Sequence, residues 1–197
     1  RSFPWAQAET NLVTNPSQSS VTEMDSTAPD YYEHPVFHSS RLMLETPAIR
    51  RVHEDVTRLI WTGATGALLI GQARQGKSTA VRSLIGRLQT RDRHEVPVYY
   101  VSMPRRDQSN ITTVLREMSW SVNLNLGKTV PADLMADQFV HYLADQASAL
   151  NCPKALLVVD ETQRLAAGQL DAFAEVHDKL LLMDVELTTL FVANDPE

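Results

Sequence analysis

Cysteine is almost absent from this chain of 197 residues, because Cys152 is the only one. A single cysteine cannot form a disulfide within the chain, and the six histidines show no zinc-type spacing with it. No apolar run approaches the roughly 20 residues that span a bilayer. Basic residues are outnumbered, since 18 Lys and Arg stand against 24 Asp and Glu and give a formal charge of −6. These absences predict a cytoplasmic protein without a membrane partner, in which any contact with nucleic acid is local.

Residues 1–40 differ in composition from the rest of the chain. They are rich in Ser, Thr, Gln, Asn and Pro and show no sustained period of about two or 3.6 residues. They are therefore predicted to form a polar N-terminal arm or linker. Residues 41–197 have the length of one α/β domain with a full core. The chain begins with Arg1 rather than methionine and ends at "NDPE", which favours a piece of a longer protein.

Strand and helix patterns alternate from residue 45 onward. The first predicted helix has Thr46 as its N-cap, Pro47 in its first turn and Gly63 beyond its end. Strands separated by crossover helices predict a parallel sheet that binds ligands at the carboxyl ends of its strands. Apolar runs predict strands at residues 66–71, 96–103, 154–161 and 187–195, and helical spacings predict further helices at residues 77–90, 110–122, 131–150 and 168–183.

The stretch "GQARQGKST" lies between the first strand and a helix. It fits the pattern G-x-x-x-x-G-K-[ST], in which glycines let successive backbone N–H groups turn around phosphates and the helix points its positive end at them. Lys77 is expected to reach the β- and γ-phosphates, and the Ser78 hydroxyl to ligate Mg²⁺. The predicted nucleotide-binding loop consists of Gly71, Gln72, Ala73, Arg74, Gln75, Gly76, Lys77, Ser78 and Thr79.

The later stretch "ALLVVDETQ" is an apolar strand that ends in two carboxylates. An acidic residue at the end of a buried strand is costly unless a cation or another partner lies there. Asp160 is therefore predicted to hold Mg²⁺ through water, and Glu161 to polarise the attacking water. The last strand, "LFVAND", ends in Asn194, whose amide can hydrogen-bond a water or the γ-phosphate. Asparagine is also a common strand terminator, so both interpretations of Asn194 stay open.

Together, the phosphate loop, the "VVDE" strand and the polar residue that ends the next strand resemble the AAA+ ATPases over roughly residues 45–197. The resemblance implies an α/β P-loop NTPase fold of three layers, whose mostly parallel sheet places the last strand between the other two. It implies ATP and Mg²⁺ as cofactors, with residues 71–79 as Walker A, Asp160 and Glu161 as Walker B, and Asn194 as sensor 1. By this resemblance, the residues that catalyse hydrolysis of ATP to ADP and phosphate are Glu161, Lys77 and Asn194.

More narrowly, "VVDETQRL" is similar to the Walker B strand of the branch that contains origin-recognition ATPases and the TnsC/TniB transposition regulators. The entry "TPAIRRVHEDVTRLI" and the compact size also resemble TnsC/TniB. This resemblance implies a ring or filament on double-stranded DNA that couples a target-selection protein to a transposase, with hydrolysis controlling disassembly. Two alternatives share every nucleotide-binding residue: an initiator or helicase-loader-like ATPase, and a nucleotide-switched signalling or scaffold module.

The chain departs from the AAA+ pattern in two places. Many AAA+ loops carry glycine where this chain has Arg74, so the backbone must reach its conformation without glycine's freedom. The Arg74 side chain is expected to reach either a neighbouring subunit or solvent. The chain also stops soon after Asn194, before the fifth strand, the arginine-finger region and the lid with sensor 2. Efficient hydrolysis by this chain alone is therefore in doubt, because an arginine finger is worth about 10³ to 10⁵ in rate.

Basic residues suited to DNA lie in "MPRRDQSN", after the second strand. Arg105 and Arg106 are adjacent and followed by polar residues, and under the transposition hypothesis they are the candidate contacts to the DNA backbone. A solvated loop with Asp107 as ion-pair partner is the competing interpretation. Arg164 is expected to form a surface salt bridge, or alternatively to sense nucleotide or contact a neighbouring subunit.

Overall fold

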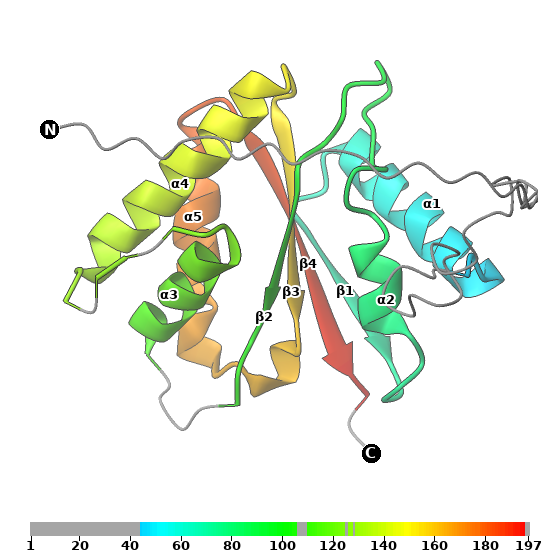
Figure 1. The fold of residues 1–197 in the computed structure, drawn as a ribbon, viewed down its shortest axis with the longest axis horizontal. Helices are drawn as coiled ribbons and strands as arrows, with labels where there is room; N and C mark the ends of the chain where they lie inside the picture. The colour runs from blue at the N-terminus through cyan, green and yellow to red at the C-terminus, as the bar shows by residue number, and fades with distance from the viewer. Residues whose placement is uncertain (1–43, 106–109, 125, 128, 196–197) are drawn as a thin grey trace, which may run out of the picture. The chain divides into compact units, whose positions relative to one another are not determined.

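The computed structural model describes residues 44–105, 110–124, 126–127 and 129–195, so the predicted arm, residues 1–40, lies outside the described part. Its centre is a four-stranded parallel sheet of order β1-β4-β3-β2 (Figure 1). The last strand in sequence therefore lies between the first and the third, which confirms the predicted order. The strands are β1 (Gly66–Gly71), β2 (Val98–Ser102), β3 (Lys154–Asp160) and β4 (Glu186–Asn194).

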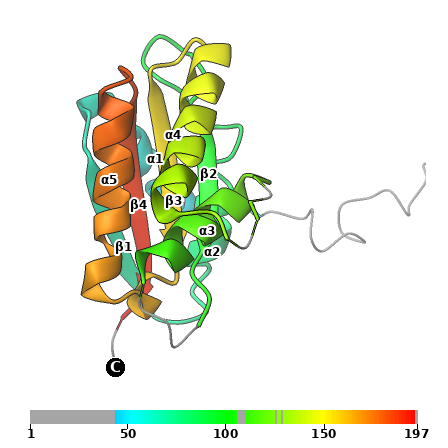
Figure 2. The ribbon, with the colours of Figure 1, turned by 90° about the vertical axis from the view of Figure 1, so that its left-hand side faces the viewer.

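Helices cover both faces of the sheet and make three layers, as predicted (Figures 1 and 2). The first two helices lie on one face and the last three on the other. Among the described residues, no helix is both long and apolar enough to cross a bilayer. The helices are α1 (Pro47–Thr62), α2 (Lys77–Arg82), α3 (Ile111–Ser121), α4 (Ala132–Ala149) and α5 (Asp171–Leu181), with 3₁₀ turns η3 (Thr162–Arg164) and η4 (Ala167–Gln169).

Helix α1 begins and ends where its capping residues predict. The Thr46 side chain accepts a hydrogen bond from the N–H of Ile49 at 3.3 Å, which satisfies one of the free donors of the first turn. Gly63 follows the helix in the left-handed conformation, with φ of 69°, and its N–H bonds back to the last turn. Val56 and Ile60 are buried against the sheet. The predicted amphipathic helix is thereby confirmed.

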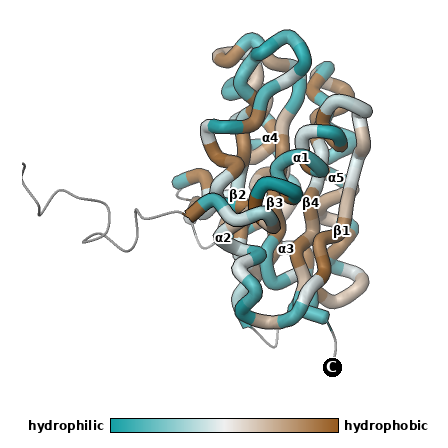
Figure 3. The backbone as a smooth tube through the Cα atoms, turned by 90° about the vertical axis from the view of Figure 1, so that its right-hand side faces the viewer, coloured by the Kyte–Doolittle hydropathy of each residue, from teal (hydrophilic) through white to brown (hydrophobic). Residues whose placement is uncertain are grey.

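The core forms on both faces of β3, because this strand alternates its side chains between two clusters. Leu157 and Val159 pack with α3, α4 and α5, whereas Leu156 and Val158 pack with α1 and α2. Hydrophobic positions follow the central strands in Figure 3. Burying one such side chain fully stabilises the fold by about 1.5–3 kcal/mol. The continuously apolar composition of this strand is thus explained by burial on both faces.

Two predicted helices are longer in the sequence analysis than in the structure. The helix expected over residues 77–90 ends at Arg82, because the Ser83 hydroxyl donates to the carbonyl of Ala80 at 2.5 Å and Gly86 has φ of 70°. The helix expected from residue 168 begins at Asp171. Before it, the Gln169 side chain accepts from the N–H of Ala166 at 2.9 Å and holds a 3₁₀ turn.

Candidate nucleotide site

The loop between β1 and α2 needs its two glycines. Gly76 has φ of 81° immediately before α2, a conformation that L side chains rarely adopt. At Gly71, a Cβ atom would lie 3.0 Å from Oε1 of Gln75 and 3.5 Å from Cδ of Lys77. Gly76 has no side chain to cap the first turn of α2, so within the described residues the N-cap position leaves the first N–H groups of that helix uncapped. The loop therefore has the open backbone donors that a phosphate requires.

Lys77 points back across the loop and contacts three oxygen atoms. Its Nζ donates to the carbonyls of Gly71 at 2.7 Å and Gln72 at 2.6 Å, and to Oδ1 of Asn194 at 2.9 Å. An ammonium group has three N–H donors, so each one has an acceptor here. Contact with a phosphate requires Lys77 to exchange at least one of these partners.

Asp160 ends β3 as a buried carboxylate, only 4% exposed, with a hydrogen bond to each oxygen. Its Oδ1 accepts from the N–H of Glu161 at 2.8 Å, and its Oδ2 accepts from the hydroxyl of Tyr100 on β2. Burial and this hydrogen bond raise the pKa of Tyr100, so the hydroxyl stays protonated and donates. The cost of burying Asp160 is thereby offset by two donors.

Glu161 follows in the left-handed conformation, with φ of 61°, and is held through one of its oxygens. Nε2 of Gln163 donates to Oε2 at 2.8 Å, and Nη2 of Arg164 lies 3.0 Å from the same atom. Arg164 also donates to the carbonyl of Met103 at 2.8 Å. The other oxygen, Oε1, accepts no hydrogen bond within the described residues, which leaves it for a water molecule. The predicted salt bridge of Arg164 thus exists, but its partner is the predicted catalytic carboxylate.

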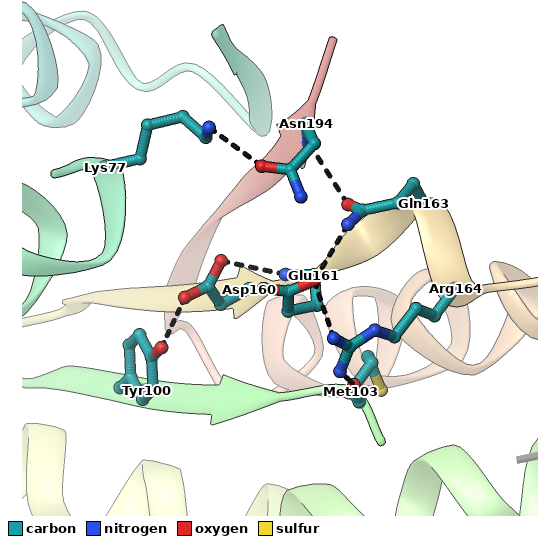
Figure 4. A network of polar contacts seen from close by, with 8 residues as sticks. All are labelled: Lys77, Tyr100, Met103, Asp160, Glu161, Gln163, Arg164 and Asn194. Atoms are coloured by element: carbon teal, nitrogen blue, oxygen red, sulfur yellow. Dashed lines mark hydrogen bonds and ion pairs between the residues drawn. The ribbon is translucent and has the colours of Figure 1, made fainter. Parts of the chain in front are cut away.

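The site has two halves: the loop half is the phosphate loop with Lys77, and the metal half is the end of β3 with Asp160 and Glu161. Asn194 connects the two halves through hydrogen bonds (Figure 4). Its Oδ1 accepts from Lys77, and its backbone N–H donates to Oε1 of Gln163 at 3.2 Å. Gln163 in turn donates to Glu161. The strand-terminator interpretation of Asn194 alone does not explain these contacts, since its amide touches the phosphate-loop lysine directly.

A cavity of about 410 Å³ gathers most of the predicted site residues. This volume is within the usual range of about 300–1,000 Å³ for small-molecule sites. Gly71, Gln72 and Gln75 do not line it, although they belong to the predicted loop. The lining residues are Ala73, Arg74, Gly76, Lys77, Ser78, Thr79, Asp160, Glu161 and Asn194.

Comparison with known protein families identifies the family of this chain. A family model described as AAA domain matches residues 61–194, more than half of the chain, from the last residues of α1 to Asn194. The chain belongs to the AAA domain family. The AAA+ part of the predicted resemblance is therefore confirmed, whereas the TnsC/TniB type is not. A search of curated proteins finds no match.

Three solved structures illustrate the similarity of this AAA domain to known proteins. Cdc6p from Pyrobaculum aerophilum is 18% identical with a TM-score of 0.49, and the match covers 86% of this chain and 41% of that one. Drosophila ORC bound to DNA is 20% identical with a TM-score of 0.49, covering 76% and 38%. C. elegans PCH-2 is 15% identical with a TM-score of 0.42, covering 78% and 39%. The matched chains are thus much longer, and this AAA domain accounts for about two fifths of each.

A second, mainly apolar cavity of about 360 Å³ lies beside the phosphate loop of the AAA domain. It separates the start of α1 from β1, with Thr46, Ile49 and Val52 on one side and Leu69 and Gly71 on the other. The sequence analysis missed this cavity. Val52, on the inner face of α1, is only half-buried because it lines this cavity, and no sequence pattern distinguishes it from the core residues of the helix.

The residues of the first cavity fit a magnesium ion. Ser78 and Asp160 line it together, and hydroxyl and carboxylate oxygens are the ligand types that Mg²⁺ prefers. Each Asp160 oxygen has one hydrogen bond, which leaves a lone pair to receive a metal-bound water. The phosphate chain of a nucleotide would supply the remaining ligands, as is usual for Mg²⁺ sites in nucleotide-binding proteins.

Of the two predicted DNA contacts, Arg105 does not line this cavity. Arg105 is exposed beyond the end of β2. Arg106 lies outside the described residues. The structure therefore brings together the nucleotide residues and leaves the two arginines as a separate prediction.

Proposed function

We propose that this AAA domain binds ATP with Mg²⁺ in the 410 Å³ cavity and hydrolyses it to ADP and phosphate. The observation that supports the proposal is that one cavity contains Lys77, Ser78, Asp160, Glu161 and Asn194, although these residues come from three separate segments of the chain. When bound, Mg²⁺ supplies positive charge that offsets the charge of the phosphates.

Each residue has a role that its contacts allow. Lys77 exchanges a loop carbonyl for a phosphate oxygen. Ser78 and Asp160, which line the same cavity, would hold the metal. Glu161 keeps Oε2 on Gln163 and Arg164 and uses Oε1 to orient the attacking water. Asn194 accepts from Lys77 through Oδ1 in the empty site, and in the loaded site its amide N–H donates to the γ-phosphate, so its contacts differ between the two states. The apolar cavity between α1 and the loop suits a flat nucleotide base.

The Glu161→Gln substitution tests the catalytic part of this proposal. It preserves the shape of the side chain and removes the carboxylate that orients water. In the full-length protein we expect the affinity for ATP to stay within about twofold and the steady-state turnover to fall at least about 100-fold, consistent with loss of a general base. Unchanged turnover would remove Glu161 from the catalytic role. The Glu175→Gln variant, which changes a half-buried ion pair on α5 away from the cavity, is the control.

At the level of biological role, we propose a regulator of transposition that assembles as a ring or filament on double-stranded DNA. The string "VVDETQRL" supports this proposal, because it is similar to the TnsC/TniB Walker B strand. The same string is typical of origin-recognition ATPases, so an initiator or helicase-loader role is the second candidate. Arg105 and Arg106 are the proposed contacts to the DNA backbone.

Electron microscopy of the full-length protein with ATP, with and without duplex DNA, tests the assembly. A ring or filament threaded by DNA is expected, and particles that remain monomeric under both conditions would contradict it. Co-purification then separates the two roles, since a transposase or target-selection protein indicates transposition and a helicase indicates replication. Nucleotide that stays bound and turnover that DNA does not stimulate would instead indicate a signalling or scaffold module.

A further inference from the structure

A tyrosine outside both nucleotide motifs contacts the carboxylate that is proposed to hold the metal. Tyr100 lies on β2 opposite Val158, two residues before Asp160, so its side chain is on the same face of the sheet as Asp160. Its hydroxyl donates to Oδ2 of Asp160. Because the N–H of Glu161 holds Oδ1, the carboxylate is fixed at both oxygens (Figure 4).

Tyr100 is itself held by the helix that follows the phosphate loop. Nη2 of Arg82 donates to the Tyr100 hydroxyl oxygen at 3.2 Å, and the guanidinium carbon lies 4.4 Å from the centre of the ring. Arg82 is the last residue of α2, whose first residue is Lys77. A chain of contacts therefore connects α2, which positions the phosphate-binding lysine, with the carboxylate at the end of β3.

The neighbouring Tyr99 shows that this arrangement is specific to one face of β2. Tyr99 points to the opposite face, where its ring meets that of Tyr142 with centres 6.2 Å apart. Its buried hydroxyl has no hydrogen-bond partner within the described part of the chain. The two adjacent tyrosines therefore differ in that only Tyr100 contacts Asp160.

We propose that Tyr100 is a positioning residue for Mg²⁺, which acts by orienting the Asp160 carboxylate, and that Arg82 supports it. The inference rests on the proposed function, since it assigns a residue to the metal half of the same site. Groups that orient a metal-binding carboxylate typically change metal affinity by about 10- to 100-fold when they are removed. Tyr100 lies on a strand that carries no nucleotide-binding motif, so sequence patterns gave no reason to select it.

The test measures the Mg²⁺ dependence of nucleotide binding rather than turnover. The full chain is titrated with a fluorescent ATP analogue at a series of Mg²⁺ concentrations and without Mg²⁺. The Tyr100→Phe variant should raise the half-saturating Mg²⁺ concentration by about 10-fold and leave the Mg²⁺-free affinity unchanged. The Tyr99→Phe variant, the same substitution one residue away, should match the parent in both measurements.

Two further outcomes keep the inference separable from the proposed function. If the parent binds the analogue in a Mg²⁺-dependent manner and Tyr100→Phe has the parent's Mg²⁺ dependence, the role of Tyr100 is wrong and the proposed function stands. If the parent shows no Mg²⁺-dependent binding, both are wrong. The Arg82→Met variant should shift the Mg²⁺ requirement about threefold. The double variant should resemble Tyr100→Phe alone, because both side chains act on one carboxylate.

Discussion

β1 and β3 both carry apolar residues to the same edge of the sheet, but their surroundings differ. β3 lies between β2 and β4, and residues 155–160 are all buried. Within the described residues, β1 pairs only with β4, and Leu68 and Ile70 are 59% and 52% exposed. Apolar composition therefore identifies a strand without indicating whether it is central or peripheral in the sheet.

The same contrast extends to the loops that follow the two strands. At the end of β3, Asp160 is held by Tyr100, and the following Glu161 is held by Gln163 and Arg164. After β1, the phosphate loop is held largely by its own residues, including the contact of Gln75 Oε1 with the N–H of Gln72 at 3.2 Å. We therefore expect the carboxylate side of the site to be formed in the free protein, and the loop side to depend more on nucleotide.

The largest expected effect is a difference in the free energy of unfolding between alanine variants of one leucine from each strand. Leu157 on β3 has no exposed surface, so Leu157→Ala should lower the free energy of unfolding by about 2–5 kcal/mol through lost burial and a new cavity. Leu68→Ala on β1 should change it by less than about 0.5 kcal/mol, as for most exposed positions. Urea denaturation of both variants measures the difference. Equal losses would contradict the contrast between the strands.

A smaller effect is expected from the side chain that joins the two halves. Gln163→Ala breaks the connection between Glu161 and the N–H of Asn194, so turnover of ATP should fall about tenfold, or about 1.4 kcal/mol in activation free energy. Affinity for ATP should stay within about twofold of the parent, since Gln163 contacts neither the loop nor Lys77. The exposed Gln138→Ala on α4 is the control. Lost affinity at unchanged turnover would show that Gln163 acts elsewhere.

The backbone conformation of Arg74 can be tested by comparing the stability of glycine and alanine variants at Arg74 and at Gln138. The order of stability should be opposite at the two positions. Arg74 has φ of 62°, a conformation that costs a residue with a side chain roughly 1–2 kcal/mol. Arg74→Gly should therefore be about 1 kcal/mol more stable than Arg74→Ala in nucleotide-free denaturation. At Gln138, inside α4, Gly should instead be about 1 kcal/mol less stable than Ala. The same order at both positions would rule out strain at Arg74.

The smallest expected effect is the pH dependence of stability that arises where α1 packs beside α2. Nε2 of His53 lies 2.6 Å from Oγ of Ser83, and burial together with Arg87 lowers the pKa of His53 against an opposing effect of Glu45. The folded protein then binds fewer protons at this histidine than the unfolded chain does. Stability should be constant above the ordinary pKa of 6.5 and decline as the pH falls below it.

His53→Gln provides the check, because glutamine cannot titrate. Denaturation between pH 7.5 and 5.5 should show a weaker decline for the variant than for the parent, with other groups contributing equally to both. A decline of the same size in both proteins would mean that His53 does not carry the effect.

Much of the fold could be predicted because its signals are local. The cap of Thr46, the glycine at position 63 and the apolar run of β3 each depend on residues close in sequence. The end of α2 at Arg82 was missed, because the back-bond from Ser83 competes with helix continuation. The exposure of Leu68 was also not predicted, because it depends on which strands lie beside β1.

The candidate site divides in the same way. The motif around Lys77 and the carboxylates at the end of β3 each occupy a few consecutive residues whose types are set by their chemistry. Their side chains could therefore be identified from the sequence. Tyr100 and Gln163 could not, because their roles come from contacts across 60 and 31 residues that depend on strand order and register. A pattern search has no access to such contacts.

The central claim is that the loop after β1 grips the phosphates of ATP through Lys77. Isothermal titration of MgATP into the parent, into Lys77→Ala and into Lys179→Ala tests it most directly, because Lys179 is a lysine of α5 that pairs with Asp137 and Glu175 away from the site. We predict that Lys77→Ala loses about 100-fold in affinity, consistent with about 2–3 kcal/mol for a charged hydrogen bond, while Lys179→Ala binds as the parent does. Binding of MgATP by Lys77→Ala with the affinity of the parent would contradict it.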